Sequence, residues 1–307
     1  MIVLVAREEY DKCEMSSIKK ILLPIDYPNV SLGVIHQSAM LARHFKAQIV
    51  MLHVVTELSH RAGVPRPGSG PVEWPMLTEV ERAAQHAKDT SLAKELEGLA
   101  IQCLLDGGDP AASIVRQAQT EKVDLIMMPS HGFTFEQFLL GSVTAGVFGR
   151  AECPLWTGAH IEDLAEPTRP AEPFAIRSVL SAVDLGPRSD KSLLWGARMA
   201  SEFNARLTVA HVTAGVNIWG PGGWHEDQEW KEALVRDASR RVARLEQDTG
   251  IKAEVFIGSG DVPKTLSQAV ERTNADLLVT GSYPYGGNLR THGYGIICAV
   301  PIPVLSV

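Results

Sequence analysis

The chain has 307 residues, of which 45% are apolar and 21% charged, and 29 basic against 36 acidic residues give a formal net charge of −7. This length predicts two ordinary domains, each with its own core, and the lack of any Lys/Arg run argues against a nucleic-acid partner. No apolar run approaches the roughly 18 residues that a membrane-spanning helix needs, so we expect no membrane partner either.

The termini and the cysteines predict a protein of the reducing cytoplasm. The first residues, "MIVLVAREEY", begin with only a short apolar run, have no basic segment before it, and become acidic directly after it. This pattern is a poor match to a secretory signal peptide. The four cysteines are scattered and form no CxxC pair, which argues against a zinc site or a disulfide framework. We therefore expect no metal site.

The first half alternates short apolar runs with amphipathic segments. The runs predict strands and the segments predict helices. We expect strands at 20–25, 48–55, 99–104, 124–128 and 153–157, and helices at 31–45, 78–96 and 110–121, with a last helix before the closing strand. Continuously apolar strands are typical of a sheet that is covered on both faces. Right-handed helical crossovers then give a mostly parallel sheet of about five strands with helices on both faces.

The second half repeats the first. "KKILLPIDYP" (19–28) matches "RSVLSAVDLG" (177–186), and four residues recur 158 positions later, namely Phe45, Ala47, His53 and Val54 as Phe203, Ala205, His211 and Val212. Identities at one offset indicate duplication. The second half is expected to have strands at 178–183, 206–213, 251–257, 276–280 and 302–307, and helices at 189–203, 226–248 and 262–273.

The duplication defines the predicted domains. The first domain covers 1–160, with the repeat proper beginning near 19, and the second covers 175–307. The stretch 161–174, "EDLAEPTRPAEPF" with its flanks, has three prolines and several charges, which is a linker composition.

The stretch "PSHGFTFEQFLLGS" (129–142) predicts a phosphate cradle or an ordinary turn with a serine cap. A cradle needs unobstructed backbone amides and a helix N-terminus facing the anion. Gly141 and Ser142 fit if a helix begins at Val143, with Ser142 capping it or contacting phosphate. Pro129 lacks an N–H and removes one donor. In open parallel sheets such loops meet at the carboxyl edge, where we also expect Asp26 and Val54 to lie.

Taken in order, "ILLPID", "LHVV", "GDPAASIVRQA", "VDLIMMPSHG", "LLGSV" and "CPLW" resemble the universal stress protein family in its tandem two-domain form. The resemblance covers nearly the whole chain apart from the N-terminal extension and the linker. It implies two tandem Rossmann-like domains and self-association through the closing strands. In many members it also implies ATP binding without strong catalysis, with Mg or Mn carried by the nucleotide.

In nucleotide-binding members the family pattern is Gly, two residues, Gly, nine residues, then Gly with Ser or Thr. The middle glycine falls on Gly132 and the last pair on Gly141 and Ser142, whereas Pro129 occupies the first position and the spacer has eight residues. Asp26 resembles the adenine contact, with capping of the following helix as the alternative, and Val54 resembles the valine near the base. The implied binding residues are Asp26, Val54, Pro129, Ser130, His131, Gly132, Gly141, Ser142 and Val143.

The second half departs further from this pattern. It keeps Gly281 and Ser282, but Gly293 is followed by Tyr294, whose phenol replaces the serine. We therefore expect at most one nucleotide per chain, bound in the first half as a sensor or regulatory ligand in the stress response. The alternatives are a nucleotide-free scaffold or interaction protein and, more weakly, a slow ATPase. Neither a nucleophile elbow nor a GxxxxGK[ST] loop is present, so we expect no catalytic residue.

Three further features have simpler interpretations. His53 and His211 are expected to be packed strand-end residues. "GPGGWHEDQEW" (220–230) is expected to be a glycine-rich loop leading into a helix with an acidic first turn, and not a metal site. "RAGVPRPGSGPVEWP" (61–75) is expected to be a loop near the crevice.

The closing strands generate the first prediction. "CPLWTG" and "PIPVLSV" are short and apolar and end each repeat, so each would expose an apolar sheet edge if it were unpaired. We expect the two strands to pair within one chain and to support a homo-oligomer. Residues 1–160 expressed alone should then self-associate in sedimentation velocity experiments, and a well-behaved monomer would contradict this.

Overall fold

The computed structural model describes residues 17–26, 31–55, 95–130, 141–158, 175–215, 217–220, 223–226, 228–282 and 289–307. These residues form two compact units, here called the first unit (within 17–158) and the second unit (175–307). The predicted loop at 61–75 and almost all of the predicted helix at 78–96 lie outside the described residues.

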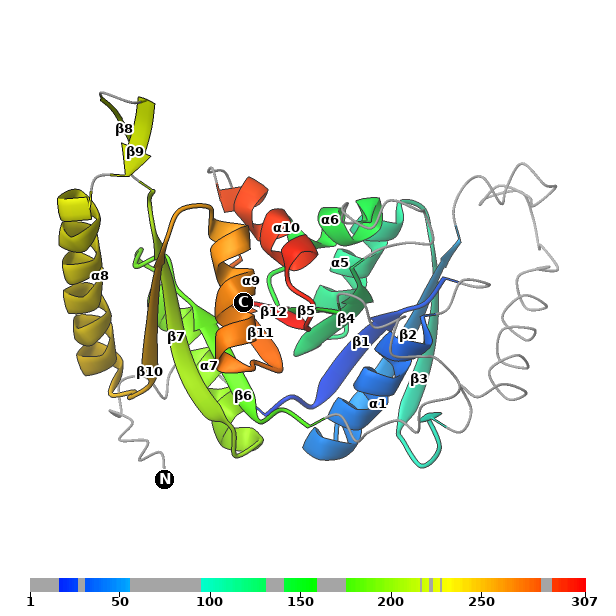
Figure 1. The fold of residues 1–307 in the computed structure, drawn as a ribbon. Coiled ribbons are helices and arrows are strands. Elements are labelled where there is room, and N and C mark those ends of the chain that lie inside the picture. The colour runs from blue at the N-terminus through cyan, green and yellow to red at the C-terminus, as the bar shows by residue number, and fades with distance from the viewer. Residues whose placement is uncertain are drawn as a thin grey trace, which may run out of the picture. The chain divides into compact units, whose positions relative to one another are not determined.

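The first unit is a parallel sheet with helices between its strands (Figure 1). Its strand order is β5-β4-β1-β2-β3, and every pair is parallel. Its elements are β1 (Lys20–Pro24), α1 (Leu32–Phe45), β2 (Gln48–Val55), β3 (Ile101–Gly107), α5 (Pro110–Thr120), β4 (Leu125–Pro129), α6 (Ser142–Phe148) and β5 (Leu155–Gly158).

The second unit repeats this arrangement and adds a hairpin. Its strand order is β10-β7-β6-β11-β12, again parallel throughout. Its elements are β6 (Ser178–Ala182), α7 (Ser189–Glu202), β7 (Arg206–Thr213), β8 (Asn217–Gly220), β9 (Gly223–Glu226), α8 (Gln228–Thr249), β10 (Glu254–Ser259), α9 (Val262–Thr273), β11 (Leu277–Thr280), α10 (Leu289–Ala299) and β12 (Val304–Ser306). The predicted pair of mostly parallel α/β sheets is confirmed.

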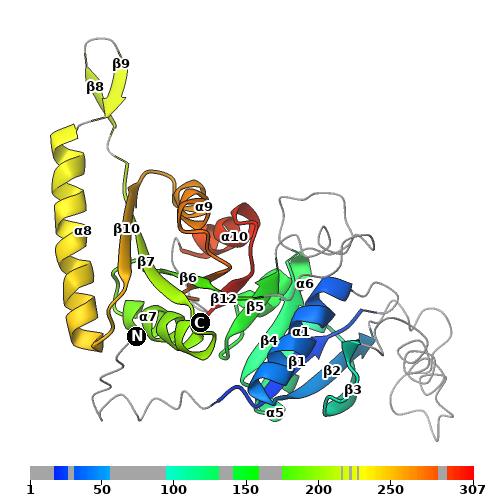
Figure 2. The same cartoon turned by 60° about the horizontal axis from the view of Figure 1, so that its bottom comes forward.

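Both faces of each sheet are covered, which explains the continuously apolar strands. In the second unit α7 and α8 lie on one face and α9 and α10 on the other (Figure 2). The middle of β1 and the whole run Leu125–Met128 of β4 are buried. A strand with helices on both sides has no face left for polar side chains.

Two strands extend beyond their predicted ends. β3 was expected at 99–104 and β10 at 251–257, but the observed strands begin later and run on to Gly107 and Ser259. The parallel ladder accounts for this, because β3 stays in register with β2 as far as the pair Val55 and Gly107. Pairing with a neighbour thus overrides the local apolar pattern.

The glycine-rich segment at 220–230 differs from its prediction. β8 and β9 pair antiparallel and form a hairpin, with only Pro221 and Gly222 between them. A two-residue connection that contains glycine favours such a hairpin. The acidic first turn is confirmed, because Glu229 lies in the first turn of α8.

An aspartate contact fixes the start of the central strand in each unit. The Asp124 carboxylate accepts the amides of Lys19 and Lys20 at 2.7 and 2.9 Å. The Asp276 carboxylate accepts those of Arg177 and Ser178 at 2.7 and 3.0 Å. Each aspartate precedes the strand that neighbours the central one, so it joins two segments that are far apart in sequence.

Removing this carboxylate should destabilise its unit. Asp124→Ala leaves two strand-start amides without their charged acceptor, and hydrogen bonds to charged groups contribute about 1.5–3 kcal/mol each. We expect a loss of about 1–3 kcal/mol in the free energy of unfolding by urea, and a similar loss for Asp276→Ala. Asp248→Ala, at an exposed position of α8, is the control, and equal stability of all three variants would contradict the prediction.

Candidate functional site at the carboxyl edge of the sheets

Each sheet has one point where the direction of strand addition reverses. The chain adds β2 and β3 on one side of β1 and then returns to place β4 on the other side, and β6 and β11 repeat this in the second unit. Ligands of open parallel sheets bind beyond the carboxyl ends of the strands at this point. The segments that follow β1 and β4 therefore border the candidate site of the first unit.

Asp26 lies at this edge, two residues after β1, and is exposed. The preceding Ile25 is held by its amide, which donates to Leu52 O at 2.8 Å. The N-cap of α1 is Ser31, whose hydroxyl accepts the amide of Val34 at 3.5 Å. The alternative interpretation of Asp26 as the helix cap was therefore wrong.

Val54 is half-buried near the end of β2 and pairs with Asp106 of β3. Sequence reasoning missed Asp106. Its partial burial raises the carboxyl pKa, but hydrogen bonds from Gln117, Gly107 and Arg116 outweigh this and hold the pKa below its usual value. The second unit has Gly258 at the matching place, so this charged cluster distinguishes the two edges.

The residues that follow β4 are tied to their neighbours. Pro129 ends β4 and its carbonyl accepts the Thr144 hydroxyl at 2.9 Å. Ser130 is buried, and both its hydroxyl, at 2.7 Å, and its amide, at 3.2 Å, donate to Gly158 O. Ser130 thus joins the residue after β4 to the end of β5. His131 and Gly132, predicted as binding residues, lie outside the described residues.

Helix α6 begins one residue earlier than predicted. Its first residue is Ser142, and its N-cap is Gly141, which provides no side-chain hydrogen bond. The interpretation of Ser142 as the cap was therefore wrong. The Gly141 amide donates to Ser130 O at 2.9 Å, whereas the amides of Ser142 and Val143 belong to the first turn, which has no acceptor within the helix. The amide of Thr144 is in the same position, since the first bond within the helix runs from the Ala145 amide to Gly141 O.

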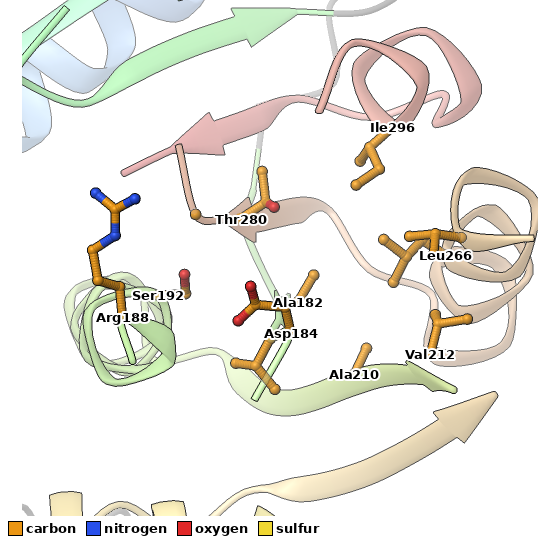
Figure 3. Close-up of a pocket in the computed structure, with 12 residues that line it drawn as sticks. Ala182, Asp184, Arg188, Ser192, Ala210, Val212, Leu266, Thr280 and Ile296 are labelled. Atoms are coloured by element: carbon orange, nitrogen blue, oxygen red, sulfur yellow. The ribbon is translucent and has the colours of Figure 1, made fainter. Parts of the chain in front are cut away.

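The second unit has a cavity at the corresponding edge (Figure 3). It lies between the ends of β6, β7 and β11, with α7, α9 and α10 around it. Asp184, the repeat of Asp26, lies at its centre, and Leu266, Val212 and Ile296 form an apolar wall. Apart from the repeat itself, no sequence pattern predicts this cavity, because its wall is made of residues from several separate segments.

The loop after β6 holds Asp184 firmly. The Asp184 carboxylate accepts the Gly186 amide and the Ser189 hydroxyl, both at 2.8 Å. Leu185, which lies between Asp184 and Gly186 in the chain, has a φ of 59°. This left-handed backbone conformation is unfavourable for a bulky residue. Its carbonyl accepts Arg241 Nη2 of α8 at 2.7 Å.

The helix after β11 begins earlier in the repeat than the helix after β4. α10 begins at Leu289, so Gly293 lies one turn inside the helix with Tyr294 after it. The family pattern has its helix entry at the positions of Gly293 and Tyr294, whereas the observed helix begins four residues earlier. Amides inside a helix donate to carbonyls four residues earlier, so those of Gly293 and Tyr294 cannot receive a phosphate.

His53 and His211 are packed strand-end residues, as predicted. His53 Nδ1 lies 3.0 Å from Ile25 O, and His211 Nδ1 lies 2.8 Å from Val183 O. Each imidazole links the end of the second strand of its unit to the segment after the first. Among the described residues, no group of three or more His, Cys, Asp or Glu side chains could hold a metal. No described helix is long and apolar enough to cross a bilayer.

Comparison with known proteins supports the repeated architecture. The sequence profile of the Universal stress protein family matches residues 17–157 and 175–292. The chain belongs to the universal stress protein family. Universal stress protein MJ0531 of Methanocaldococcus jannaschii is 34% identical over 140 residues, which cover 45% of this chain and 79% of the relative. Universal stress protein MJ0577 of the same organism is 31% identical over 152 residues, covering 45% and 92%.

A solved structure matches the whole length. A universal stress protein of Archaeoglobus fulgidus superposes with a TM-score of 0.62 at 21% identity, covering 94% of this chain and 96% of that one. At this identity the likeness shows the fold alone. It agrees with two tandem universal stress protein domains built on Rossmann-like sheets.

The histidine at the end of β7 generates a pH prediction. Burial lowers the pKa of His211, and Arg241 adds to this, whereas the hydrogen bond to Val183 and the Asp184 carboxylate raise it less. The unfolded chain then binds a proton more readily than the folded one, so stability falls as the pH drops through the usual histidine pKa of about 6.5.

Urea unfolding at pH 7.5 and 5.5 tests this dependence. The intact chain should lose more unfolding free energy on acidification than His211→Gln, whose amide can still donate to Val183 O. An equal loss in both proteins would show that His211 does not carry the effect.

Proposed function

We propose that this universal stress protein binds one adenine nucleotide, ATP in the simplest case, at the carboxyl edge of its first unit. The observation that carries the proposal is the start of α6. Its first-turn amides include those of Ser142 and Val143. The helix follows the carboxyl end of β4, at the point where the direction of strand addition in the sheet reverses. A helix N-terminus with unpartnered amides favours an anion.

Two hydrogen bonds that hold the start of α6 in place strengthen the proposal. Gly141 donates to Ser130 O, and Thr144 donates to Pro129 O, at 2.9 Å in both cases. These two bonds fix the helix start to the end of β4 before any ligand arrives. Preorganised donors bind an anion without the cost of ordering them first.

The remaining roles follow from position. Asp26 is proposed to accept from the adenine amine or the ribose, with Val54 packing near the base. His131, Gly132 and Ser130 are proposed to line the phosphate loop, Ser130 through its backbone because its hydroxyl is given to Gly158. Pro129 supplies no amide, so Ser142 and Val143 carry more of the phosphate contact. Mg or Mn would arrive with the nucleotide.

The proposed role is that of a nucleotide sensor or regulator in the stress response of the cytoplasm, and not of an efficient enzyme. The described edge offers no group placed to activate a water molecule for hydrolysis. A nucleotide-free scaffold is the second candidate, favoured by Pro129 at the first position of the family pattern. Nucleotide released from the denatured purified protein would favour the sensor, and its absence the scaffold.

A charge introduced at the helix start tests the binding site. Gly141→Asp places a carboxylate beside the phosphates, and repulsion between unit charges about 4 Å apart costs on the order of 1 kcal/mol even in water. We expect ATP affinity, measured by titration calorimetry, to fall at least about fivefold, with one site per chain in the unaltered protein.

Gln119→Asp is the matched control. Gln119 is exposed near the end of α5, which leads to the opposite edge of the sheet, so the same added charge should leave ATP binding unchanged. Two sites per chain, or equal binding by the Gly141→Asp variant, would overturn the assignment.

A further inference from the structure

We propose that β10 is an interface for a second copy of this chain, in which the two β10 strands pair antiparallel and join the second-unit sheets of two molecules. This interface is separate from the closing strands and does not depend on nucleotide binding by the first unit. Three features carry it: the open backbone groups of β10, its uncharged sequence, and a carboxylate that occupies the matching edge of the first unit.

β10 is an edge strand of the second unit (Figure 1). Within the described residues it has a neighbouring strand on one side only, which is β7. The Gly260 amide, just after β10, donates to Thr213 O of β7 at 3.0 Å. Successive residues of a strand direct their backbone groups to alternate sides. Val255, Ile257 and Ser259 therefore direct their N–H and C=O groups away from β7, to the open edge.

The open part of this edge begins at Val255. The amide of Ala253, which points to the same side, donates to Glu246 of α8 at 3.0 Å. Among the described residues no such acceptor meets the amides of Val255 and Ile257. The Val255 side chain is also 48% exposed. An apolar strand edge with unpaired backbone groups favours the addition of another strand.

The sequence of the edge suits an identical strand. Residues 255–259, "VFIGS", carry no charge, although the whole chain has a net charge of −7. Two copies can therefore approach here without placing like charges opposite each other, which would destabilise a strand pair. A twofold axis makes such an edge complementary to its own copy, and twofold dimers are the commonest homo-oligomers. The occupant is therefore a second β10.

The open residues determine the register. With the twofold axis at Ile257, this residue lies opposite Ile257 of the second copy, and Val255 lies opposite Ser259 of the second copy. Any other twofold register leaves at least one of these three residues without an open partner. Phe256 then lies opposite Gly258 of the second copy, and an aromatic side chain beside a glycine stabilises a strand pair.

The matching edge of the first unit carries a charge. Gly107 of β3 takes the place of Ser259, and its amide donates to Asp106 Oδ1 at 2.8 Å. The second unit has Gly258 in place of Asp106, so it lacks this carboxylate. A charged residue on an edge strand opposes the addition of another strand. The two edges therefore differ, and β10 is the edge that accepts a second copy.

A cysteine at the twofold axis tests the register in the full chain. Opposite residues that exchange backbone bonds have Cα atoms about 5.5 Å apart, within the roughly 4.4–6.8 Å of disulfides. In a Cys103→Ser background, which removes an exposed thiol, Ile257→Cys should form a disulfide-linked dimer under mild oxidation. Val255→Cys is the control, because the two copies of this residue would lie more than about 13 Å apart. No linked dimer of Ile257→Cys, or an equal yield from Val255→Cys, would overturn the proposal.

A proline on the edge tests the association itself. Val255→Pro removes an N–H that β7 does not use, and prolines are tolerated at such edge positions. In sedimentation velocity over a concentration series, the dissociation constant of the dimer should rise at least about tenfold, because a twofold interface loses each bond twice.

Cys103→Pro is the matched control. Cys103 is exposed and occupies in β3 the place that Val255 occupies in β10, so this variant should associate as strongly as the unaltered chain. A full chain that stays monomeric at every concentration would overturn the proposal. Equal dissociation constants for the two proline variants would place the interface elsewhere and would overturn it too.

Discussion

The parallel pairing of the first strand with the fourth in each unit is the constraint on which the rest depends. β1 lies between β2 and β4, and β6 lies between β7 and β11. In each unit the chain must therefore cross back over its first strand to place the fourth strand on the other side. The carboxylates of Asp124 and Asp276 hold this return, because each accepts two amides at the start of the central strand. The reversal then leaves the ends of the first and fourth strands facing the same edge, where the nucleotide site proposed for the first unit lies.

Both repeats keep this strand arrangement and its aspartate contact, but they differ in where the helix after the fourth strand begins. The helix after the fourth strand starts at Ser142 in the first unit and at Leu289 in the second, although the aligned glycines are Gly141 and Gly293. One extra turn converts amides of the first turn into internal helix donors. The same ancestral edge can therefore differ in the ligand chemistry that it offers, without any change in the order of the strands.

Much of the fold could be predicted because local sequence patterns specify its elements. The apolar strands, the repeat, and the caps Asp109 and Asp261, each followed by a proline in the first turn, are all visible in sequence. The added residues of β3 and β10 could not be predicted, since they depend on the ladder with a neighbouring strand. Nor was the start of α10 at Leu289 anticipated, because the family pattern has its helix entry at Gly293. The cavity of the second unit was missed because its walls come from six separate elements.

The paired aspartates show why a matching position does not imply a matching role. Asp26 and Asp184 occupy the same place in the repeat, and Ser31 and Ser189 occupy the next one. In the first unit Ser31 caps α1 through the Val34 amide, whereas in the second Ser189 donates its hydroxyl to Asp184. In the second unit the loop thus fixes the carboxylate of Asp184, whereas in the first unit the serine caps the helix.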